Sequence, residues 1–300
     1  MFNITEELRK PGVKRVILDT DTYNEIDDQY ALIYLLRSPK KLNLKAIYAA
    51  PFFNERSTSP ENGMEKSYEE IIRLLNLSGN TDYIDKTFKG SKTYLPDETT
   101  PVISDAAEHL VKLAANYSEE NPLYVVAIGA ITNVASALLM EPSIADKIVV
   151  VWLGGHGEHF HHTEEFNMKQ DVAAARVVFS KAPVVQLPCM GVVSAFAFSP
   201  MELEHYLRGK GELAEYLLDI TLQHMEEHPH PAVYSKAIWD VTAVAWLLND
   251  NDRFMLWNHR PQLMPQYDHH YSVKPDKLMT YVYHINRDEL ASDLFEKVTR

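Results

Sequence analysis

The chain has 300 residues, which is enough for one large domain with a substantial buried core. Its 29 Lys and Arg residues against 42 Asp and Glu residues give a net charge of −13, which opposes binding to nucleic acid or an anionic membrane and favours a neutral or cationic small ligand. The one cysteine, Cys189, excludes an internal disulfide and fits a cytoplasmic location. Residues 1–12 lack an apolar core, and no apolar run approaches the ~18 residues that a membrane span needs, so neither export nor insertion is expected.

Short apolar runs typical of strands alternate with segments of helical periodicity. The predicted strands cover residues 13–18, 44–50, 123–128, 147–153, 183–187 and 278–285. The predicted helices cover residues 28–36, 65–77, 105–117, 133–140, 172–179, 213–227, 236–248 and 288–297. This alternation predicts an α/β fold, with a single domain over residues 1–300 and an open, mostly parallel, Rossmann-like sheet covered by helices on both faces. Residues 52–63 and 87–101 are expected to be polar loops, and residues 224–231 a hinge rich in His and Pro.

The stretch from Asp19 to Asp28 reads Asp-Thr-Asp-Thr-Tyr-Asn-Glu-Ile-Asp-Asp and carries five acidic side chains in ten residues. It fills the turn between the first predicted strand and the first predicted helix, where open α/β sheets place ligands. Such a cluster repels itself unless a cation lies in it, and its oxygen donors suit Ca²⁺ or Mg²⁺ better than zinc. The alternative is an acidic loop in solvent. An EF-hand is excluded, because counting from Asp19 the sixth residue is Asn24 instead of Gly and the twelfth is Tyr30 instead of Glu.

Polar residues also follow the later predicted strands. Asn54 follows the second strand, Thr132 the third, and Glu165 and Asn167 lie beyond the fourth. Because the carboxyl ends of parallel strands share one edge of a sheet, these side chains are expected to converge on the acidic turn. Asp240 lies within an apolar stretch, where a buried carboxylate needs a partner or a metal ion.

In combination, these motifs resemble the nucleoside hydrolases, calcium-dependent enzymes that cleave the N-glycosidic bond of ribonucleosides. The resemblance extends over residues 13–248 and rests on the order of Asp-x-Asp, Asp-Asp-x-x-Ala-Leu, Ile-Gly-Ala-Ile-Thr-Asn-Val, Leu-Gly-Gly, Glu-Phe-Asn-x-x-x-Asp and a late Asp. It implies the nucleoside hydrolase fold, one bound Ca²⁺, hydrolysis of a nucleoside to free base and ribose, and a homodimer or homotetramer.

The resemblance also implies a role for each matching residue. The implied calcium ligands are Asp21, Asp28, the backbone carbonyl of Thr132, and Asp240, with Asp21 also acting as the general base and Asp19 lying behind the ligands. The implied sugar contacts are Asp27 at the 2′-hydroxyl, Asn54 and Asn167 near the 3′-hydroxyl, and Glu165 near the 5′-hydroxyl. Two positions depart from the family but are still expected to contact substrate: His159 replaces an asparagine, and Trp239 replaces a histidine beside the leaving base.

The implied chemistry agrees with these residue types. N-glycoside hydrolysis passes through an oxocarbenium-like state, and water attacks the anomeric carbon from the face opposite the departing base. A carboxylate beside a divalent cation has a depressed pKa and is ionised at neutral pH, as a general base must be.

Two differences from the family, the length of the acidic turn and the residue at position 239, affect the expected contacts with substrate. Five residues separate Asp21 from Asp27 where well-known members have three, so Asn24 or Glu25 is expected to enter the site. Indole cannot donate an acidic proton, so Trp239 would stack on the base instead. The candidate proton donors are Tyr234, His230 and His159.

Other interpretations stay open. Trp239 favours a non-catalytic, calcium-dependent sugar or nucleoside binder. The stretch Asp19-Thr20-Asp21-Thr22 after an apolar strand also resembles the Asp-x-Asp-x-Thr start of haloacid-dehalogenase-type phosphatases, although the later Gly-Asp-x-x-x-Asp of that class is missing. His224 and His228 could bind a metal on a helix face, or be solvated or substrate-contacting like His159, His161, His162 and His230. Each matching residue also has a purely structural interpretation: Asn54 as a loop cap, Thr132 as a helix N-cap, Asn167 as a turn residue and Trp239 as packing.

Overall fold

The computed structural model describes residues 12–228 and 230–300, so the expectation for residues 1–11 lies outside the described residues and the expected hinge at 224–231 is described except for residue 229. Within these ranges one sheet has eight strands in the order β3-β2-β1-β4-β5-β6-β10-β9. They are β1 (Lys14–Thr20), β2 (Leu42–Ala49), β3 (Thr87–Lys89), β4 (Leu123–Ala127), β5 (Ile148–Leu153), β6 (Val184–Leu187), β9 (Met255–Pro265) and β10 (Tyr271–Ile285). Neighbouring strands are parallel except β9, which runs antiparallel to β10. The predicted open, mostly parallel sheet is confirmed.

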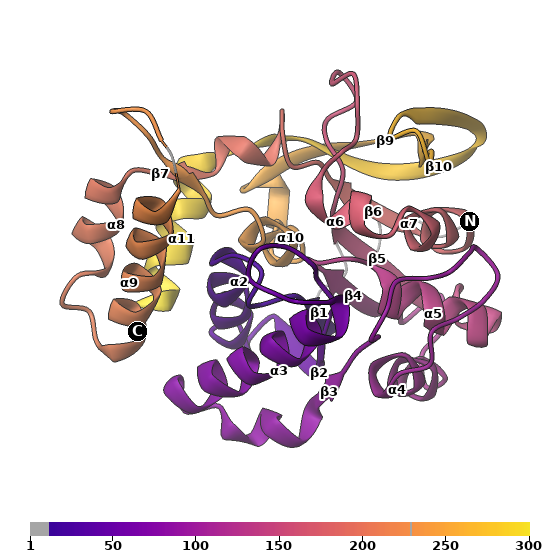
Figure 1. Cartoon of the computed structure of the whole chain (residues 1–300), viewed down its shortest axis with the longest axis horizontal. Helices are drawn as coiled ribbons and strands as arrows, with labels where there is room; N and C mark the ends of the chain where they lie inside the picture. The colour runs from indigo at the N-terminus through magenta and orange to yellow at the C-terminus, as the bar shows by residue number, and fades with distance from the viewer. Residues whose placement is uncertain (1–11, 229) are drawn as a thin grey trace.

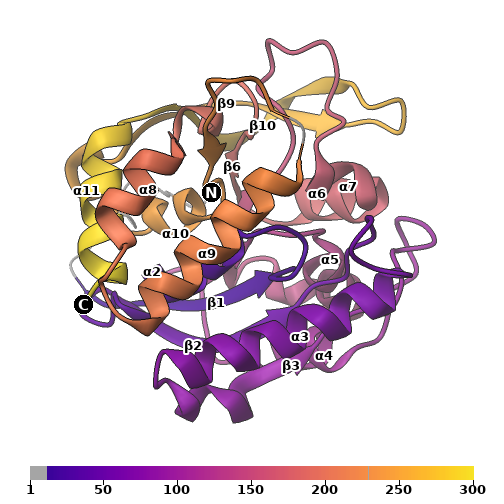
Figure 2. The same cartoon turned by 60° about the vertical axis from the view of Figure 1, so that its left-hand side comes forward.

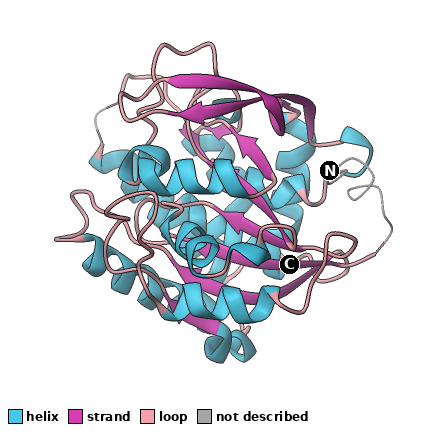
Figure 3. Ribbon diagram, turned by 90° about the vertical axis from the view of Figure 1, so that its right-hand side faces the viewer, coloured by secondary structure: helices cyan, strands magenta, loops and turns pink. Residues whose placement is uncertain are grey.

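Helices cover both faces of this sheet. One face carries α2 (Asp27–Leu36), α3 (Pro60–Leu77), α9 (Glu212–Glu227), α10 (Val241–Trp246) and α11 (Arg287–Val298). The other face carries α4 (Asp105–Ala114), α5 (Thr132–Met140) and α7 (Val172–Lys181). Figure 1 shows α2, α9 and α11 on one side and α4, α5 and α7 on the other, Figure 2 brings α3 and α9 to the front, and Figure 3 shows the twisted sheet among the helices. In the described part of the chain, no helix is long and apolar enough to cross a membrane.

Alternation along the strands divides the core between these two faces, because successive residues of a strand point to opposite sides. On β1, Val16 and Leu18 pack on the face that carries α2, and Ile17 packs on the face that carries α5. All three side chains are fully buried. The near-continuous apolar run of β1 therefore reflects a strand buried on both sides, as parallel strands are.

The chain reverses its direction of travel across the sheet between β1 and β4. From β1 it proceeds to β2 and β3 at one edge, and then returns to β4, β5 and β6 on the other side of β1. Strands β1 and β4 pair directly, with Asp19 opposite Ala127. Loops leave such a switch point in opposite directions, which creates a crevice at the carboxyl ends of the strands. The acidic turn, residues 19–28, lies there, as the sequence predicts.

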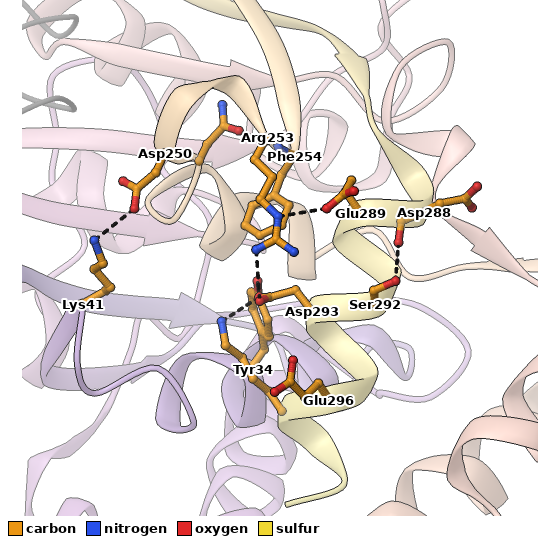
Figure 4. A network of polar contacts seen from close by, with 12 residues as sticks. Tyr34, Lys41, Asp250, Arg253, Phe254, Asp288, Glu289, Ser292, Asp293 and Glu296 are labelled. Carbon is orange, nitrogen blue, oxygen red and sulfur yellow. Dashed lines mark hydrogen bonds and ion pairs between the residues drawn. The ribbon is translucent and has the colours of Figure 1, made fainter.

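A polar network holds the first helix of the site in place. The Tyr34 hydroxyl of α2 donates a hydrogen bond of 2.5 Å to Asp293 of α11, and Lys297 donates to the same carboxylate over 2.6 Å. Arg253 lies 3.8 Å from the other Asp293 oxygen and forms an ion pair with Glu289 (Figure 4). Helix α2, which begins with Asp27 and Asp28, is thereby fixed to the last helix of the chain.

The helix predicted over residues 236–248 is the main error in the secondary structure. Lys236 and Ala237 form strand β8 and pair with β7 (Ala197–Phe198), and the helix α10 begins only at Val241. The intervening residues Trp239 and Asp240 direct their backbone N–H groups at a carboxylate of the acidic turn. This contact across the fold competes with helical hydrogen bonding, and helical periodicity alone cannot predict it.

Other elements extend or add to the predicted set. Helix α3 starts at Pro60, five residues earlier than predicted, because Ser59 accepts a hydrogen bond from Asn62 as its N-cap. Helix α8 (Pro200–Leu207) has a capping box between Ser199 and Glu202, a sequence signal that could have identified it. The short helix α6 (Phe166–Gln170), β3 in the expected loop 87–101, and β9 were also not predicted. Strand β9 contains two prolines, which an edge strand tolerates.

Candidate active site

A cavity of about 290 Å³ lies at the carboxyl ends of the central strands. Its volume is near the lower end of the ~300–1,000 Å³ usual for small-molecule sites, which suits a ligand about the size of one nucleoside. Six of the predicted site residues line it: Asp27, Asn54, Glu165, Asn167, Trp239 and Asp240. Asn24 and Glu25 from the lengthened turn line it as well, as expected. Residues that are far apart in the sequence therefore line the same cavity.

Three carboxylates form a compact group, and two of them, Asp27 and Asp240, line this cavity. Asp27, Asp28 and Asp240 are buried, and one oxygen from each lies within 4.8 Å of the others. Asp27 and Asp28 open helix α2, and Asp240 precedes α10, so the two helices converge on the cluster. The Asp28 and Asp240 carboxyl groups also hydrogen-bond each other. The predicted ligand set named Asp21 where this group has Asp27.

Asp21 lies beside this group and is itself buried without hydrogen bonds. Its side chain is fully buried, and both carboxylate oxygens lack a partner among the described residues. A Cβ atom at Gly129, in the turn after β4, would lie 2.9 Å from the Asp21 carboxyl carbon, so a larger residue there would displace Asp21. A buried carboxylate without a partner has a large desolvation cost, which a cation can offset.

Burial and mutual repulsion raise the pKa values of the whole cluster. Burial, and then the Asp27 charge, raises the pKa of Asp28 to about 8, while burial raises the pKa of Asp27 to about 6. Burial and then the charges of Asp28 and Asp27 raise the pKa of Asp21 well above its ordinary range. Burial and then Asp27 do the same to the pKa of Asp240. A bound cation would favour the ionised forms of these carboxylates, so the group could hold a metal ion.

The Asp27 carboxylate also accepts hydrogen bonds from the backbone before α10. One of its oxygens accepts the backbone N–H of Trp239 at 2.9 Å and that of Asp240 at 3.3 Å. This carboxylate therefore fixes the segment that carries Asp240 into the cluster and Trp239 into the cavity wall. The Trp239 backbone, and not its indole, makes this contact.

Thr132 and Asp19 are fully buried, and neither is among the residues that line the cavity. The Thr132 hydroxyl donates a hydrogen bond of 2.7 Å to Asp171, which also caps helix α7 through the N–H of Ala174. Asp19 accepts a hydrogen bond of 2.8 Å from the Asn133 side chain, and burial raises the Asp19 pKa to about 7. Thr132 is the first residue of α5 and does not cap it through its side chain. Asp171, the last residue of the Glu-Phe-Asn-x-x-x-Asp motif, thus has a structural role.

The lengthened acidic turn makes its own contacts with the cavity wall. Asn54 donates a hydrogen bond of 2.7 Å to the Asn24 side chain and accepts one of 2.9 Å from the Arg56 backbone. Glu25 forms an ion pair with Lys236. Asn24 and Glu25 therefore link the turn to the loop after β2 and to β8.

Glu165 and Asn167 are held by the backbone around them. The Glu165 carboxylate accepts N–H groups from Gly155 at 2.8 Å, Asn167 at 2.9 Å and Met168 at 2.9 Å, which makes it the N-cap of α6. The Asn167 side-chain amide donates to the carbonyl oxygens of Ile128 and Leu153, at 3.1 and 3.0 Å. Both residues thus join the loops that follow β4 and β5.

The histidines are distributed differently from the prediction. His156 and His224 line the cavity, whereas His159 is exposed and lies outside the described lining, with its ring against Gly157 and Gly191. His230 stacks on Tyr234 at 3.6 Å, and neither residue is among those lining the cavity. The rings of His224 and His228 are 4.1 Å apart. Burial, and then the Lys236 charge, lowers the pKa of His224 to about 4, so it is neutral at pH 7.

Sequence reasoning missed several lining residues for identifiable reasons. His156 follows Gly154-Gly155 at the end of β5, a position that the strand-end argument could have included. His224 lies in α9, far along the chain, and no local pattern connects it to the acidic turn. Phe166, Cys189 and Met190 also line the cavity, and their types are common in ordinary cores.

The fold and site define a doubly wound α/β protein with a carboxylate-rich ligand cavity at its switch point. Residues 16–287 match the family described as inosine-uridine preferring nucleoside hydrolase. Over 242 residues the chain is 27% identical to "Probable uridine nucleosidase 2" of Oryza sativa subsp. japonica, covering 73% of this chain and 69% of that protein. It is 26% identical to "Pyrimidine-specific ribonucleoside hydrolase RihA" of Enterobacter sp. (strain 638), covering 78% of each.

Solved structures agree with this result. The "Purine-Preferring Ribonucleoside Hydrolase from Gardnerella vaginalis" superposes with a TM-score of 0.75 at 20% identity, covering 95% of this chain and 98% of that one. At this identity the likeness concerns the fold. The family match covers most of the chain, so the chain belongs to the inosine-uridine preferring nucleoside hydrolase family. Membership places it among the N-glycosyl hydrolases of ribonucleosides and argues against the phosphatase interpretation.

Proposed function

We propose that this protein hydrolyses the N-glycosidic bond of a ribonucleoside to release free base and ribose, with Ca²⁺ as its metal ion. The observation that carries the proposal is the buried group of Asp27, Asp28 and Asp240, of which Asp27 and Asp240 line a nucleoside-sized cavity, with the unpartnered Asp21 beside it. Oxygen-only donors fit a hard divalent cation, and the family to which the chain belongs acts on the matching substrate class.

In this proposal Asp21, Asp28, Asp240 and the Thr132 carbonyl hold the cation. When bound, Ca²⁺ would orient the sugar hydroxyls and the attacking water and make that water easier to deprotonate. Asp21 accepts the proton of the water, because its oxygens are not engaged elsewhere in the described structure. Asp27 contacts the 2′-hydroxyl through the oxygen left beside its backbone contacts, and Asn54 and Asn167 lie near the 3′-hydroxyl.

The base would occupy the part of the cavity beside Trp239 and His224. Trp239 offers an aromatic face there, and His224 is a neutral imidazole that can donate or accept one hydrogen bond. Trp239 and His224 together would take the place of the histidine that the family resemblance expects at position 239. His159, Tyr234 and His230 lie outside the described lining, so His224 is the better positioned group to contact a departing base.

The test is release of free base from a panel of nucleosides by the purified protein, with Ca²⁺ and after chelation. Uridine and inosine come first, because two relatives are named for uridine or pyrimidines and one solved structure for purines. Calcium-dependent release of base and reducing sugar supports the proposal. Trp239 favours one rival, a calcium-dependent binder without turnover. Ribose or nucleoside binding without base release from any member of the panel would support that rival.

Two further features are proposals on the same basis. The family resemblance implies a homodimer or homotetramer, which light scattering at several protein concentrations would measure. The single cysteine fits a cytoplasmic location.

A further inference from the structure

The cavity gives the two ends of a bound ribose different surroundings. If the proposed function holds, the 2′- and 3′-hydroxyls face the carboxylate group at β1 and α10. The base, on C1′, then lies toward Trp239 and His224, and the 5′-carbon, on C4′, lies on the other side of the ring oxygen. The family resemblance places the 5′-hydroxyl near Glu165, and the loops after β5 and β6 contribute His156, Glu165 and Cys189 to the lining.

Glu165 has little remaining capacity to accept a 5′-hydroxyl in this wall. Its carboxylate already accepts three backbone N–H groups, and the Cys189 thiol is a fourth hydrogen-bonding neighbour. A carboxylate offers about four lone-pair positions. The resemblance assigns the 5′-hydroxyl to Glu165, yet its oxygens are engaged in capping α6 and fixing Gly155.

His156 is the neighbouring side chain with an unused polar atom. Its Nδ1 is buried and has no hydrogen-bond partner among the described residues, while its ring lines the cavity. The ring centroids of Phe160 and His162 each lie 5.5 Å from that of His156. Burial, and then the charge of His162, lowers the pKa of His156 below its ordinary value, so the imidazole is neutral and can donate or accept. Leaving such a nitrogen unpaired costs free energy, which a ligand hydroxyl would recover.

The backbone fixes His156 in this place. Gly155 has a φ of +77°, and a Cβ atom there would lie 2.1 Å from the Tyr271 hydroxyl, so the turn after β5 requires glycine. Tyr271 donates a hydrogen bond of 3.3 Å to the His156 carbonyl, and Gly157 donates one of 2.9 Å to the carbonyl of Met190. The orientation of His156 is therefore set by β10 and by the loop after β6.

We propose that the His156 side chain binds the 5′-hydroxyl of the ribonucleoside and sets the preference of the enzyme for an unmodified 5′ position. Glu165 then acts as a positioning residue, which holds Gly155 and the start of α6 so that His156 faces the sugar. A substrate without the 5′-hydroxyl cannot make this hydrogen bond to the imidazole and should be a poorer substrate for this reason.

The test compares uridine with 5′-deoxyuridine, or another cleaved nucleoside with its 5′-deoxy analogue, on the wild type, His156→Ala and His156→Gln. The expected wild-type preference in kcat/KM for the 5′-hydroxyl is about 10-fold, the size of one hydrogen bond to a buried group. His156→Ala should lose this preference because the rate on uridine falls while the rate on 5′-deoxyuridine stays the same. His156→Gln, which retains a donor and an acceptor, should keep part of the preference.

His161→Ala is the matched control, because His161 is exposed in the same loop and should show the wild-type preference. Equal losses on both substrates in His156→Ala and His156→Gln would mean that His156 only supports the fold. An undiminished preference in His156→Ala would assign the 5′-hydroxyl to another residue, Glu165 first. Either result overturns the proposal.

The role of His156 can be tested even if the protein does not hydrolyse nucleosides. If wild type releases base from no nucleoside, the proposed hydrolysis fails, and the same variants are compared by calorimetric binding of uridine and 5′-deoxyuridine. Tighter binding of uridine that disappears only in His156→Ala supports the role of His156 in a binder. Equal affinities of the wild type for the two ligands would reject it.

Discussion

Glu25 and Lys236 form an ion pair that joins the acidic turn to strand β8 at the wall of the cavity. The Lys236 side chain is only 13% exposed and that of Glu25 38%. Burial works against the charged form of Lys236, yet the Glu25 and Asp27 carboxylates raise the Lys236 pKa above its ordinary value. Lys236 therefore offsets part of the negative charge of the carboxylate group. This contact depends on Glu25, which belongs to the longer turn of this chain.

Replacing Lys236 by Met should destabilise the metal-free protein more than replacing Glu25 by Gln. The first change leaves Glu25 and Asp27 without their cation, whereas the second leaves Lys236 beside Asp27. Because Glu25 is partly exposed, the expected loss for Lys236→Met is about 1–2 kcal/mol, below the ~3–5 kcal/mol for a fully buried pair. Denaturant unfolding of both variants in EDTA measures the difference. Equal stabilities would mean that Lys236 acts only through Glu25.

Asp28→Ala should abolish the calcium response while changing the stability of the metal-free protein little, because the lost hydrogen bond from Thr20 offsets the relieved repulsion. Wild type should gain about 2.7 kcal/mol when free Ca²⁺ is 100 times its Kd, because the ion binds only the folded state. Removing Asp28 removes a ligand but also relieves repulsion on Asp21, Asp27 and Asp240. Thermal melts with EDTA and with Ca²⁺, together with metal analysis, check this. A wild type that contains no calcium and gains none on titration would end the assignment.

Cation binding should release protons at neutral pH. The pKa values of about 6 for Asp27 and about 8 for Asp28 mean that the metal-free cluster retains protons at pH 7 that the unfolded chain has lost. In this range the folded state binds more protons than the unfolded state, so the free energy of unfolding of the metal-free protein should fall as pH rises from ~5 to ~8. Added cation should weaken this dependence. Calorimetry in buffers of different ionisation enthalpy counts the protons, and zero release at pH 7 would contradict the pKa values.

The sequence predicted the acidic turn and its surroundings because their signals are local. Asp21, Asp27 and Asp28 lie between one apolar strand and one helix, and the strand ends before Asn54 and Glu165 can be located from periodicity alone. The residues alone identify Asp240 only as a buried acid in need of a partner, and its place beside Asp28 follows from the family resemblance. Its partner, Asp27, lies 213 residues away and determines where α10 begins.

The histidine that lines the cavity could not be predicted from the sequence. The family resemblance predicts a substrate contact for His159, because it occupies the position of a family asparagine. The glycine turn at residues 154–155 instead brings His156 to the cavity. That turn is fixed by Tyr271, on a hairpin whose first strand contains two prolines and does not read as a strand. Contacts of this kind between distant segments, rather than residue types, decide which histidine lines the cavity.

Asp21→Asn should abolish hydrolysis while the fold remains intact. The amide has nearly the same shape but cannot accept the proton of the water at neutral pH, and loss of a general base typically reduces the rate by ~10²–10⁴-fold. Because Asp21 is buried and unpartnered, replacing its charge should leave the metal-free protein at least as stable as wild type. Steady-state kinetics and thermal melts measure the two effects. Near-normal turnover would move the base to another carboxylate, Glu25 first.

Trp239→Ala should separate recognition of the base from the metal site. The indole lines the cavity, but Trp239 contacts Asp27 through its backbone N–H, which alanine retains. Calcium binding through Asp240 should therefore persist, while loss of a stacking face worth about 0.5–1.5 kcal/mol should reduce kcat/KM for nucleosides about 2- to 10-fold. A p-nitrophenyl riboside already has a good leaving group, so its chemical step should be affected less. Equal losses on the two substrates, accompanied by a lower melting temperature, would show that Trp239 mainly packs the segment before α10 and that His224 or another group contacts the base.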